Sequence, residues 1–502
     1  MTRRATRRSA AVGILLLLPA PIALAQASAS QPATGFALTP EPSSAPATSA
    51  TSAPAKLPGP KYFLLRYNDD FRYLDGPAGS YTPDLFDPLK NIRFGEDWRL
   101  RFGGEYRIRI ESNTNETLGS FDRTQDTYAP HRLYAHADLH YREVFRVFVE
   151  TINARIEDRD TPKRPIDENR WDFHQLFGDV RVLGEEVPLT LRVGRQELAY
   201  GAERLVSILD WANVRRRFDG AKLFWSDETW NIDVWYMRPI VIDLALQRNR
   251  EMDHYDEDQH FYGAYATYKK IPNHVLDVYF LALVNRGDVR NANGEVGDLS
   301  VYTYGARFGG RSGAWDYDAE ASGQFGRWAG DYVQAWQLAL EGGYTLKEVA
   351  WTPRLGAGFD IASGDKNPND ESHGTFNQLF PLAHAYLGLG DQFARENIIA
   401  PNVSLTLKPS QKVTLISRYS AFWAYHLRDA LYGVSGAPSR RNVNGVSGAE
   451  FGHEIDVTLN YAIDTHQSVL LGWTHFWTGE FVRETGPSDN QDFFYLMYTI
   501  KF

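Results

Sequence analysis

Arginines that recur at every second position are the residues in this sequence best placed to do chemistry. Arg99 and Arg101, and then Arg107 and Arg109, alternate with apolar side chains. A guanidinium group binds a carboxylate through two parallel hydrogen bonds from its planar fork. The spacing therefore predicts a row of anion-binding groups along one face of an extended segment. Arginines at comparable positions of later segments extend this set: Arg132, Arg146, Arg181, Arg192, Arg307, Arg354 and Arg418.

Acidic residues on the same alternating face gather toward the middle and the end of the chain. They are Asp233, Asp277, Asp316, Asp318, Glu320, Glu341, Asp360, Glu454 and Asp456. Basic and acidic walls that face one another would create a transverse field across a narrow pore, and weak sites in series would let an anion pass. Alternatively, the charges neutralise one another in salt bridges across the wall. Both interpretations stay open for any single arginine, and anion attraction is favoured for the cluster as a whole.

Enzyme motifs are absent from the sequence. It contains no P-loop, no GxGxxG after a strand, no HExxH and no GxSxG. Asp316 and Asp318 could serve hydrolysis, but a polar channel wall requires the same spacing. Ser417 and His426 do not provide a nucleophile and a base on one face. The sequence therefore predicts neither catalysis nor a cofactor, although a hydrolase carried on a barrel wall is kept as a third hypothesis.

A weak metal signal lies in one long loop. The run Asp365, Asn367, Asn369, Asp370 and Glu371 contains Ca²⁺-type ligands, but turns use the same residue types. The loop predicted over 363–398 is too long for a tight turn, and further long loops are expected over 155–172 and 433–450. Long loops in compact barrels usually have a function, such as folding over or into the pore.

In the segments that position these charges, apolar and charged side chains alternate strictly. Trp98, Leu100 and Phe102 fall on one flank of the first segment, and the arginines fall on the other. Runs of this kind recur after residue 92, separated by Gly, Asn, Asp and Pro. The chain is polar on average, with a mean hydropathy of −0.41, yet 14% of it is aromatic. We therefore predict an all-β transmembrane antiparallel barrel of about 18 strands, with long extracellular loops and a water-filled lumen.

The two ends of the chain agree with export to an outer membrane. Arg3 to Arg8 and the short apolar run Ala10–Leu18 precede Ala23-Leu24-Ala25, which predicts a signal peptide over 1–25. A flexible Ser/Ala/Pro-rich linker is expected over 26–60 and the barrel over 61–502. The chain ends on Phe502, after an alternating strand that would aggregate if it were the edge of a soluble sheet. The net charge of −10 disfavours a nucleic-acid partner.

Several motifs resemble the alginate export family. Gly194-Arg195-Gln196-Glu197-Leu198 is followed by Tyr200-Gly201 and Arg204-Leu205, and Thr375–Pro381 is followed by His384, Gly388 and Asp391. Gly452–Asp456 and the terminal aromatic strand also match, so the resemblance covers about residues 60–502. It implies an 18-stranded outer-membrane barrel whose arginine-rich constriction passes alginate, with Arg195, Glu197 and Arg204 near the constriction. Parity places Arg195 on the lipid side, so we expect a bulge or strand end there.

The leading hypothesis is an outer-membrane channel for an anionic polysaccharide such as a polyuronate, with no chemistry of its own. The alternative is a general or anion-selective porin for small solutes. Expected partners are the anionic polymer or a small anionic solute, outer-membrane lipid and a periplasmic export machinery.

Overall fold

The computed structural model describes residue 57 and residues 59–502, except 78, 121–124, 245–250, 443–444 and 446. The predicted signal peptide and all of the predicted linker except residues 57, 59 and 60 lie outside the described residues. Among the described residues, no helix is long and apolar enough to cross a membrane.

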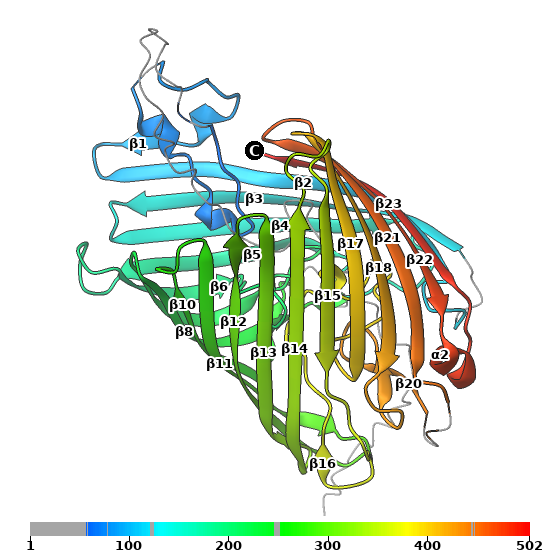
Figure 1. Cartoon of the computed structure of the whole chain (residues 1–502). Helices are drawn as coiled ribbons and strands as arrows, with labels where there is room; N and C mark the ends of the chain where they lie inside the picture. The colour runs from blue at the N-terminus through cyan, green and yellow to red at the C-terminus, as the bar shows by residue number, and fades with distance from the viewer. Residues whose placement is uncertain are drawn as a thin grey trace, which may run out of the picture.

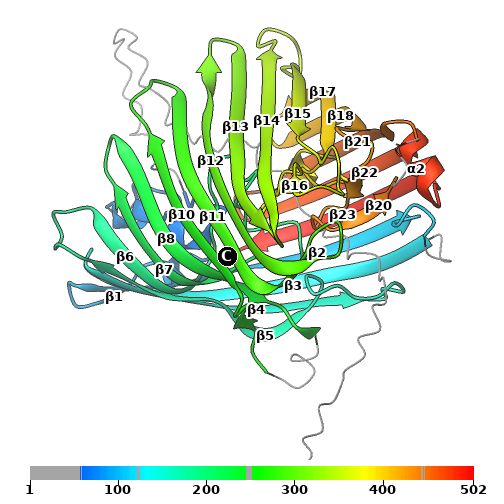
Figure 2. The same ribbon diagram turned by 90° about the horizontal axis from the view of Figure 1, so that it is seen from below.

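Eighteen of the described strands form a closed antiparallel barrel in which neighbours in the chain pair with one another (Figures 1 and 2). The barrel closes where the first strand, β2, pairs with the last, β23, with Glu105 opposite Lys501. The predicted fold class is confirmed. The barrel strands are β2 (Trp98–Thr114), β3 (Gln125–Tyr141), β4 (Phe145–Glu157), β5 (Asn169–Arg181), β6 (Leu189–Gln196), β7 (Phe218–Ser226), β8 (Trp230–Val241), β10 (Gln259–Tyr268), β11 (His274–Arg290), β12 (Val296–Ser312), β13 (Trp315–Trp328), β14 (Asp331–Thr345), β15 (Arg354–Ala362), β17 (Ile398–Ser410), β18 (Val413–Ala424), β21 (Glu450–Ala462), β22 (Gln467–Thr478) and β23 (Gln491–Lys501).

Short elements lie before and between these strands. They are the strands β1 (Ile92–Phe94), β9 (His254–Tyr255), β16 (Ser372–His373), β19 (Ala430–Tyr432) and β20 (Pro438–Arg441), the helix α2 (Glu480–Thr485) and four 3₁₀ turns, η1 (Arg66–Asn68), η2 (Arg72–Asp75), η3 (Asp87–Leu89) and η4 (Ala383–Ala385).

The alternation of side chains decides which flank of each strand faces outward. On β2, Ile110 is 50% exposed on the outer surface, whereas Arg107 is 2% exposed inside the barrel. Trp98 and Phe102 share the outer face with Ile110. Successive side chains of a strand point to opposite faces. An apolar outer face and a charged inner face are what a barrel needs when lipid surrounds it.

The two ends of the barrel differ in the length of their connections. At the short-turn end, neighbouring strands are joined by segments such as 142–144, 227–229 and 411–412, and at the long-loop end by segments such as 197–217, 363–397 and 425–449. Tryptophan and tyrosine pair across neighbouring strands at the short-turn end, for example Trp98 with Tyr141, whose ring centroids lie 4.8 Å apart. Aromatic girdles of this kind mark the membrane interface of barrels.

The three predicted long loops are present at the long-loop end. Residues 363–397 connect β15 to β17, and 425–449 connect β18 to β21. The connection between β4 and β5 is shorter than predicted, since it covers only 158–168. Both flanking strands continue into the charged segment 155–172 that the sequence predicts as a loop.

Candidate functional site

The loop 197–217, here the bridging loop, enters the barrel and is held first by arginines of β2 and β3. Arg107 donates to the carbonyl oxygen of Asp210 at 2.8 Å and to those of Trp211 and Ala212 at 2.9 Å. Arg109 donates to the Trp211 carbonyl at 2.6 Å, and Arg132 donates to the Ala212 carbonyl at 2.9 Å. We call Arg107, Arg109 and Arg132 the basic wall.

The charges of the basic wall are balanced unequally. Arg132 also forms ion pairs with Glu105 and Asp210, and Arg109 pairs with Glu111 at 2.6 Å. Arg107 lies 4.0 Å from the carboxylate of Asp210. It also donates to three backbone carbonyls of the bridging loop.

The same loop reaches the opposite side of the barrel through Arg204. This residue is fully buried and donates to Asp318 at 2.5 Å and to Glu320 at 3.1 Å on β13, and to Glu341 at 3.3 Å on β14. We call Asp318, Glu320 and Glu341 the acidic wall. Because β13 is the ninth strand from β3 in a ring of eighteen, the bridging loop spans the lumen from one side to the other.

A glycine of the predicted motif lies just before the bridging loop. Gly194 has φ +129°, a conformation that disfavours other residues, and a Cβ there would lie 2.2 Å from the carbonyl oxygen of Leu176. Strand β6 ends two residues later, at Gln196. The bridging loop then begins with Glu197, which is buried.

Residues 363–397, here the second inserted loop, support the bridging loop from the other side. The amide of Ser207 donates to the carbonyl of Phe380 at 2.8 Å, and the amide of Phe380 donates to the carbonyl of Leu205 at 3.0 Å. Leu205 and Phe393 belong to one buried apolar cluster that contains side chains of both loops and of the barrel wall. The middle of the lumen is therefore occupied by two loops that pack on each other.

The segment 61–76 before the first barrel strand also reaches the lumen. Arg66 is 4% exposed and donates to Glu150 on β4 at 2.5 Å, and its guanidinium lies 4.1 Å from the ring of Tyr134. The carbonyl of Leu64 accepts a hydrogen bond from Arg215 of the bridging loop at 3.1 Å. The N-terminal segment and the bridging loop therefore meet inside the barrel.

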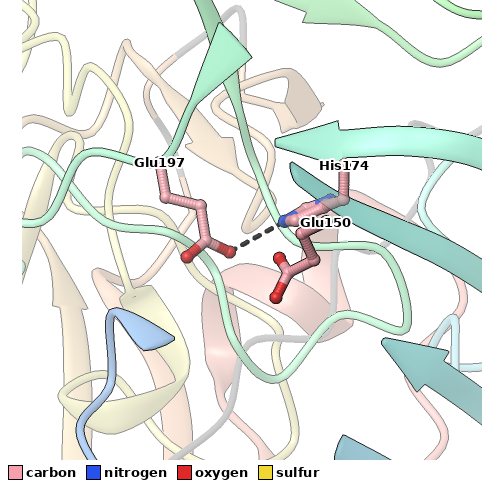
Figure 3. Close-up of side chains that lie close together, drawn as sticks. All are labelled: Glu150, His174 and Glu197. Carbon is pink, nitrogen blue, oxygen red and sulfur yellow. Dashed lines mark hydrogen bonds and ion pairs between the residues drawn. The ribbon is translucent and has the colours of Figure 1, made fainter. Parts of the chain in front are cut away.

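Glu150, His174 and Glu197 form the only cluster of metal-type ligands found among the described residues (Figure 3). Nε2 of His174 lies 2.8 Å from a carboxylate oxygen of Glu197, and all three side chains are fully buried. The two carboxylates already have cationic partners, because Arg66 contacts Glu150 and Arg215 lies 3.5 Å from Glu197. The arrangement is that of a charge network which ties Arg66 and Arg215 to the barrel.

The other predicted arginines of the lumen mostly have partners. Arg101 pairs with Asp138 at 2.8 Å, and Arg418 donates to the carbonyl of Ala385 in the second inserted loop at 2.6 Å. Arg99 forms no ion pair with any described residue, and it lines a cavity at the short-turn end. Four others pair with carboxylates of nearby strands, and Arg181 donates to the carbonyl of Val187: the pairs are Arg146 with Asp138, Arg192 with Asp179, Arg307 with Asp277 and Asp318, and Arg354 with Asp316.

Arg195 lies apart from the basic wall. It is the penultimate residue of β6, so the expected strand end is one residue away, and its alternation with Arg192 and Gln196 puts it on the outer flank. Its Nε donates to Asp219 of β7 at 2.9 Å. It also contacts Asp172 and the carbonyls of Phe173 and Asp253, none of which belongs to the basic or the acidic wall.

The run of Ca²⁺-type ligands in the second inserted loop forms turns. The carboxylate of Asp365 accepts from the amide of Asn367 at 3.0 Å, and that of Asp370 accepts from the amide of Ser372 at 2.9 Å. These are the local bonds by which aspartate shapes a turn. They account for the residue types that the sequence shows there.

Sequence reasoning missed the importance of Arg66 and of the three arginines 215–217. Three consecutive arginines were a visible signal, but they lie outside every alternating segment.

Burial raises the pKa of Glu203, in the bridging loop, to about 7, and Asp210 adds to this, although the hydroxyl donor Ser207 acts in the opposite direction. Burial lowers the pKa of Arg216 to about 10.

Comparison with known proteins agrees with this architecture. A family model described as alginate export matches residues 98–496, and no curated protein matches the chain. Among solved structures, the Pseudomonas aeruginosa proteins OpdQ and OccK5 (OpdH) have TM-scores of 0.54 and 0.52, each at 12% identity, over 80% of this chain and 97% and 98% of theirs.

A third similar structure is P. aeruginosa OccK2 (OpdF) in complex with glucuronate, with a TM-score of 0.52 and 12% identity over 80% of this chain and 98% of that one. At such identities the likeness shows the barrel fold alone. The family model covers most of the chain, and the fold is that of outer-membrane porins. The chain therefore belongs to the alginate export family and is an outer-membrane β-barrel channel.

Proposed function

We propose that the channel conducts an anionic, uronate-containing polysaccharide across the outer membrane, with the basic wall as its contact surface. The observation that carries this proposal is the set of carbonyl oxygens that the bridging loop places on Arg107, Arg109 and Arg132, at 2.6 to 2.9 Å. These oxygens occupy the positions that substrate carboxylates would take. The family description, alginate export, names a polyuronate and supports the same substrate class.

A carboxylate has the physical means to replace these carbonyls. Hydrogen bonds between a guanidinium and a carboxylate are roughly twice as strong as those between neutral groups, and they are often bidentate. Arg107 is one such position, because it donates to three carbonyls of the bridging loop. A polymer with one carboxylate on each sugar could move along such sites in steps, since several weak sites in series bind without trapping.

A small anionic solute is the second candidate substrate. Two loops packed on each other narrow the middle of the lumen, which favours a compact solute over an extended polymer. The structural neighbour OccK2 (OpdF) was solved with glucuronate, a single uronate sugar.

Conductance measurements on the purified protein in planar lipid bilayers test the proposal. We expect a reversal potential that favours anions under a KCl gradient, and current block by oligouronates of increasing length but not by neutral oligosaccharides of matched length. Block that strengthens with each added uronate unit supports the polymer. Block by the monomer with no further gain supports the small solute. A cation-selective channel that is insensitive to uronates would overturn both.

A further inference from the structure

A cavity of about 280 Å³ lies where the two inserted loops meet the loops of the long-loop end. Its wall includes Arg216 and Val214 of the bridging loop, Leu379 of the second inserted loop, Ile166 of the β4–β5 loop and Ile242 after β8. The volume is near the lower end of the roughly 300 to 1,000 Å³ typical of small-molecule sites. Most of the lining side chains are apolar, and they surround a small number of polar groups.

Arg216 is the arginine of this cavity that forms no ion pair with a described carboxylate, since the buried Glu203 acts on it only from beyond ion-pair distance, and its guanidinium lies 5.4 Å from the ring of Phe380. Its Nη1 donates to the carbonyls of Ser207 at 3.1 Å and of Pro381 at 3.4 Å. Its Nε and Nη2 make no hydrogen bond to any described residue, and no described carboxylate lies within ion-pair distance. The side chain is only partly exposed. Two adjacent donors of its planar fork are therefore available to a ligand.

The two neighbouring arginines, unlike Arg216, form ion pairs with carboxylates. Arg215 pairs with Asp210 and lies 3.5 Å from Glu197. Arg217 donates to Asp172 at 2.7 Å and to Asp253 at 2.6 Å. Both also line the cavity, but their charges are met by buried carboxylates. Of three consecutive arginines in the cavity wall, only the middle one forms no direct ion pair with a described residue.

We propose that this cavity is a binding site for one uronate sugar, whose carboxylate pairs with Arg216 while the ring packs on the apolar wall. An incoming carboxylate would form the direct ion pair that no described carboxylate forms with Arg216, and the fork formed by Nε and Nη2 matches its two oxygens. The C–H face of a sugar ring suits a wall of Ile166, Val214 and Leu379. The site lies outside the basic wall and involves a residue that is not part of the alternating strands.

This inference rests on the proposed function for its choice of sugar. It extends that function by placing a separate docking position on the long-loop side of the bridging loop. Short turns of outer-membrane barrels face the periplasm and long loops face the exterior. The site would therefore hold a uronate unit on the external side of the constriction.

Binding is measured apart from transport, by isothermal titration calorimetry of the full-length protein in detergent. The probes are glucuronate, glucose, which lacks the carboxylate, and acetate, which lacks the ring. We expect affinity to fall in the order glucuronate, acetate, glucose. Arg216→Gln should weaken glucuronate binding by about tenfold or more, because a hydrogen bond to a charged group is lost. Arg216→Lys should fall between, since the charge remains but the planar fork does not.

Two further variants separate this site from a general charge effect. Arg155→Gln removes one arginine near the same end of the barrel, at a position that alternates with the buried Ala154 and Ile156, and should leave binding unchanged. Ile242→Trp fills the cavity from its rim without changing the charge and should weaken glucuronate binding as Arg216→Gln does. Heat-modifiable migration on gels checks that each variant is folded.

The outcomes distinguish this site from the proposed function. Unchanged glucuronate affinity in folded Arg216→Gln and Ile242→Trp protein overturns the site, and the channel proposal then stands or falls on the bilayer measurements. Arg216-dependent glucuronate binding in a channel that shows no uronate block supports the site and counts against the proposed transport. Equal loss of affinity in Arg155→Gln and Arg216→Gln overturns the site in favour of a diffuse charge effect.

Discussion

The basic wall and the acidic wall hold the same loop by different chemistry. On the basic wall, Arg107 is bound mainly by neutral carbonyls of the bridging loop. On the acidic wall, Asp318 and Glu320 are met by the full charge of Arg204 and, for Asp318, also by Arg307. The loop therefore meets the acidic wall through one arginine, whereas it meets the basic wall through three backbone carbonyls together with the carboxylate of Asp210, which pairs with Arg132.

The difference indicates which contact a ligand could exchange. A buried ion pair that loses one partner leaves an uncompensated charge, which costs about 3–5 kcal/mol. A carbonyl on a guanidinium is a neutral acceptor and can be replaced by an anion without leaving any charge buried alone. The contact with the acidic wall should therefore act as the fixed anchor of the bridging loop, and the contact with the basic wall as the exchangeable one.

Removal of the fixed anchor should have the largest effect. Arg204→Gln leaves Asp318, Glu320 and Glu341 without their loop partner, so the bridging loop should detach from β13 and β14 at a cost of about 3–5 kcal/mol. In planar bilayers we expect a higher single-channel conductance together with a shift toward cations.

Arg307→Gln is the matched control, because it removes one positive charge from Asp318, which Arg204 also contacts, and from Asp277, but forms no hydrogen bond or ion pair with the bridging loop. It should shift selectivity toward cations without raising the conductance. Equal conductance in the two variants would show that Arg204 does not anchor the loop.

Removal of the exchangeable contact should have a smaller effect of a different kind. Arg107→Gln loses donors to three carbonyls, worth about 1.5–3 kcal/mol for a charged donor. Conductance should rise less than in Arg204→Gln, and block by oligouronates should weaken. Arg101→Gln, on the same strand and face but paired with Asp138, is the control. Stronger block in Arg107→Gln would contradict the assignment of the basic wall as the substrate surface.

A change of pH should alter how firmly the bridging loop is held, without any substitution in the basic or the acidic wall. The pKa of Glu203 is raised to about 7, chiefly by burial. A carboxyl with a raised pKa stabilises its buried position when it is protonated, and this contribution is lost as the pH rises from about 4.5 through 7. The bridging loop should therefore be held less firmly at pH 8 than at pH 5, by on the order of 1–2 kcal/mol.

Proteolysis of the bridging loop at a series of pH values measures this effect. Cleavage should increase with pH in the wild-type protein, and Glu203→Gln should flatten the profile because its side chain does not titrate. A variant profile that still rises through pH 7 would assign the dependence to another group.

Much of the barrel was predictable because the residue pattern within each strand is enough to choose which of its faces points to the lipid. The alternation of Trp98 and Phe102 with arginines is enough to choose the lipid face, since side chains of a strand alternate between its two flanks. The strand count and the resemblance to the alginate export family followed from the repeat and from the motifs. The boundary of the β4–β5 connection was wrong, because charged residues that look like a loop also suit strands that extend beyond the membrane.

The candidate site was predictable only in part. Parity puts Arg107, Arg109 and Arg132 on the inner flank of their strands, but the carbonyls of the bridging loop to which they donate lie more than 75 positions away in the chain. Backbone carbonyls leave no trace in a sequence pattern. Arg216 could not be told from Arg215 and Arg217 for a similar reason, since what separates them is whether a distant carboxylate reaches each one.

The amino-acid sequence by itself determined the membrane-facing surface, the polar interior and the number of strands, because these depend on the period of neighbouring residues. Only the tertiary structure decided which interior charges are satisfied. Closing the barrel brings β3 and β13 to opposite sides of one lumen and lets two loops fold between them, and the partner of each arginine depends on that distant packing.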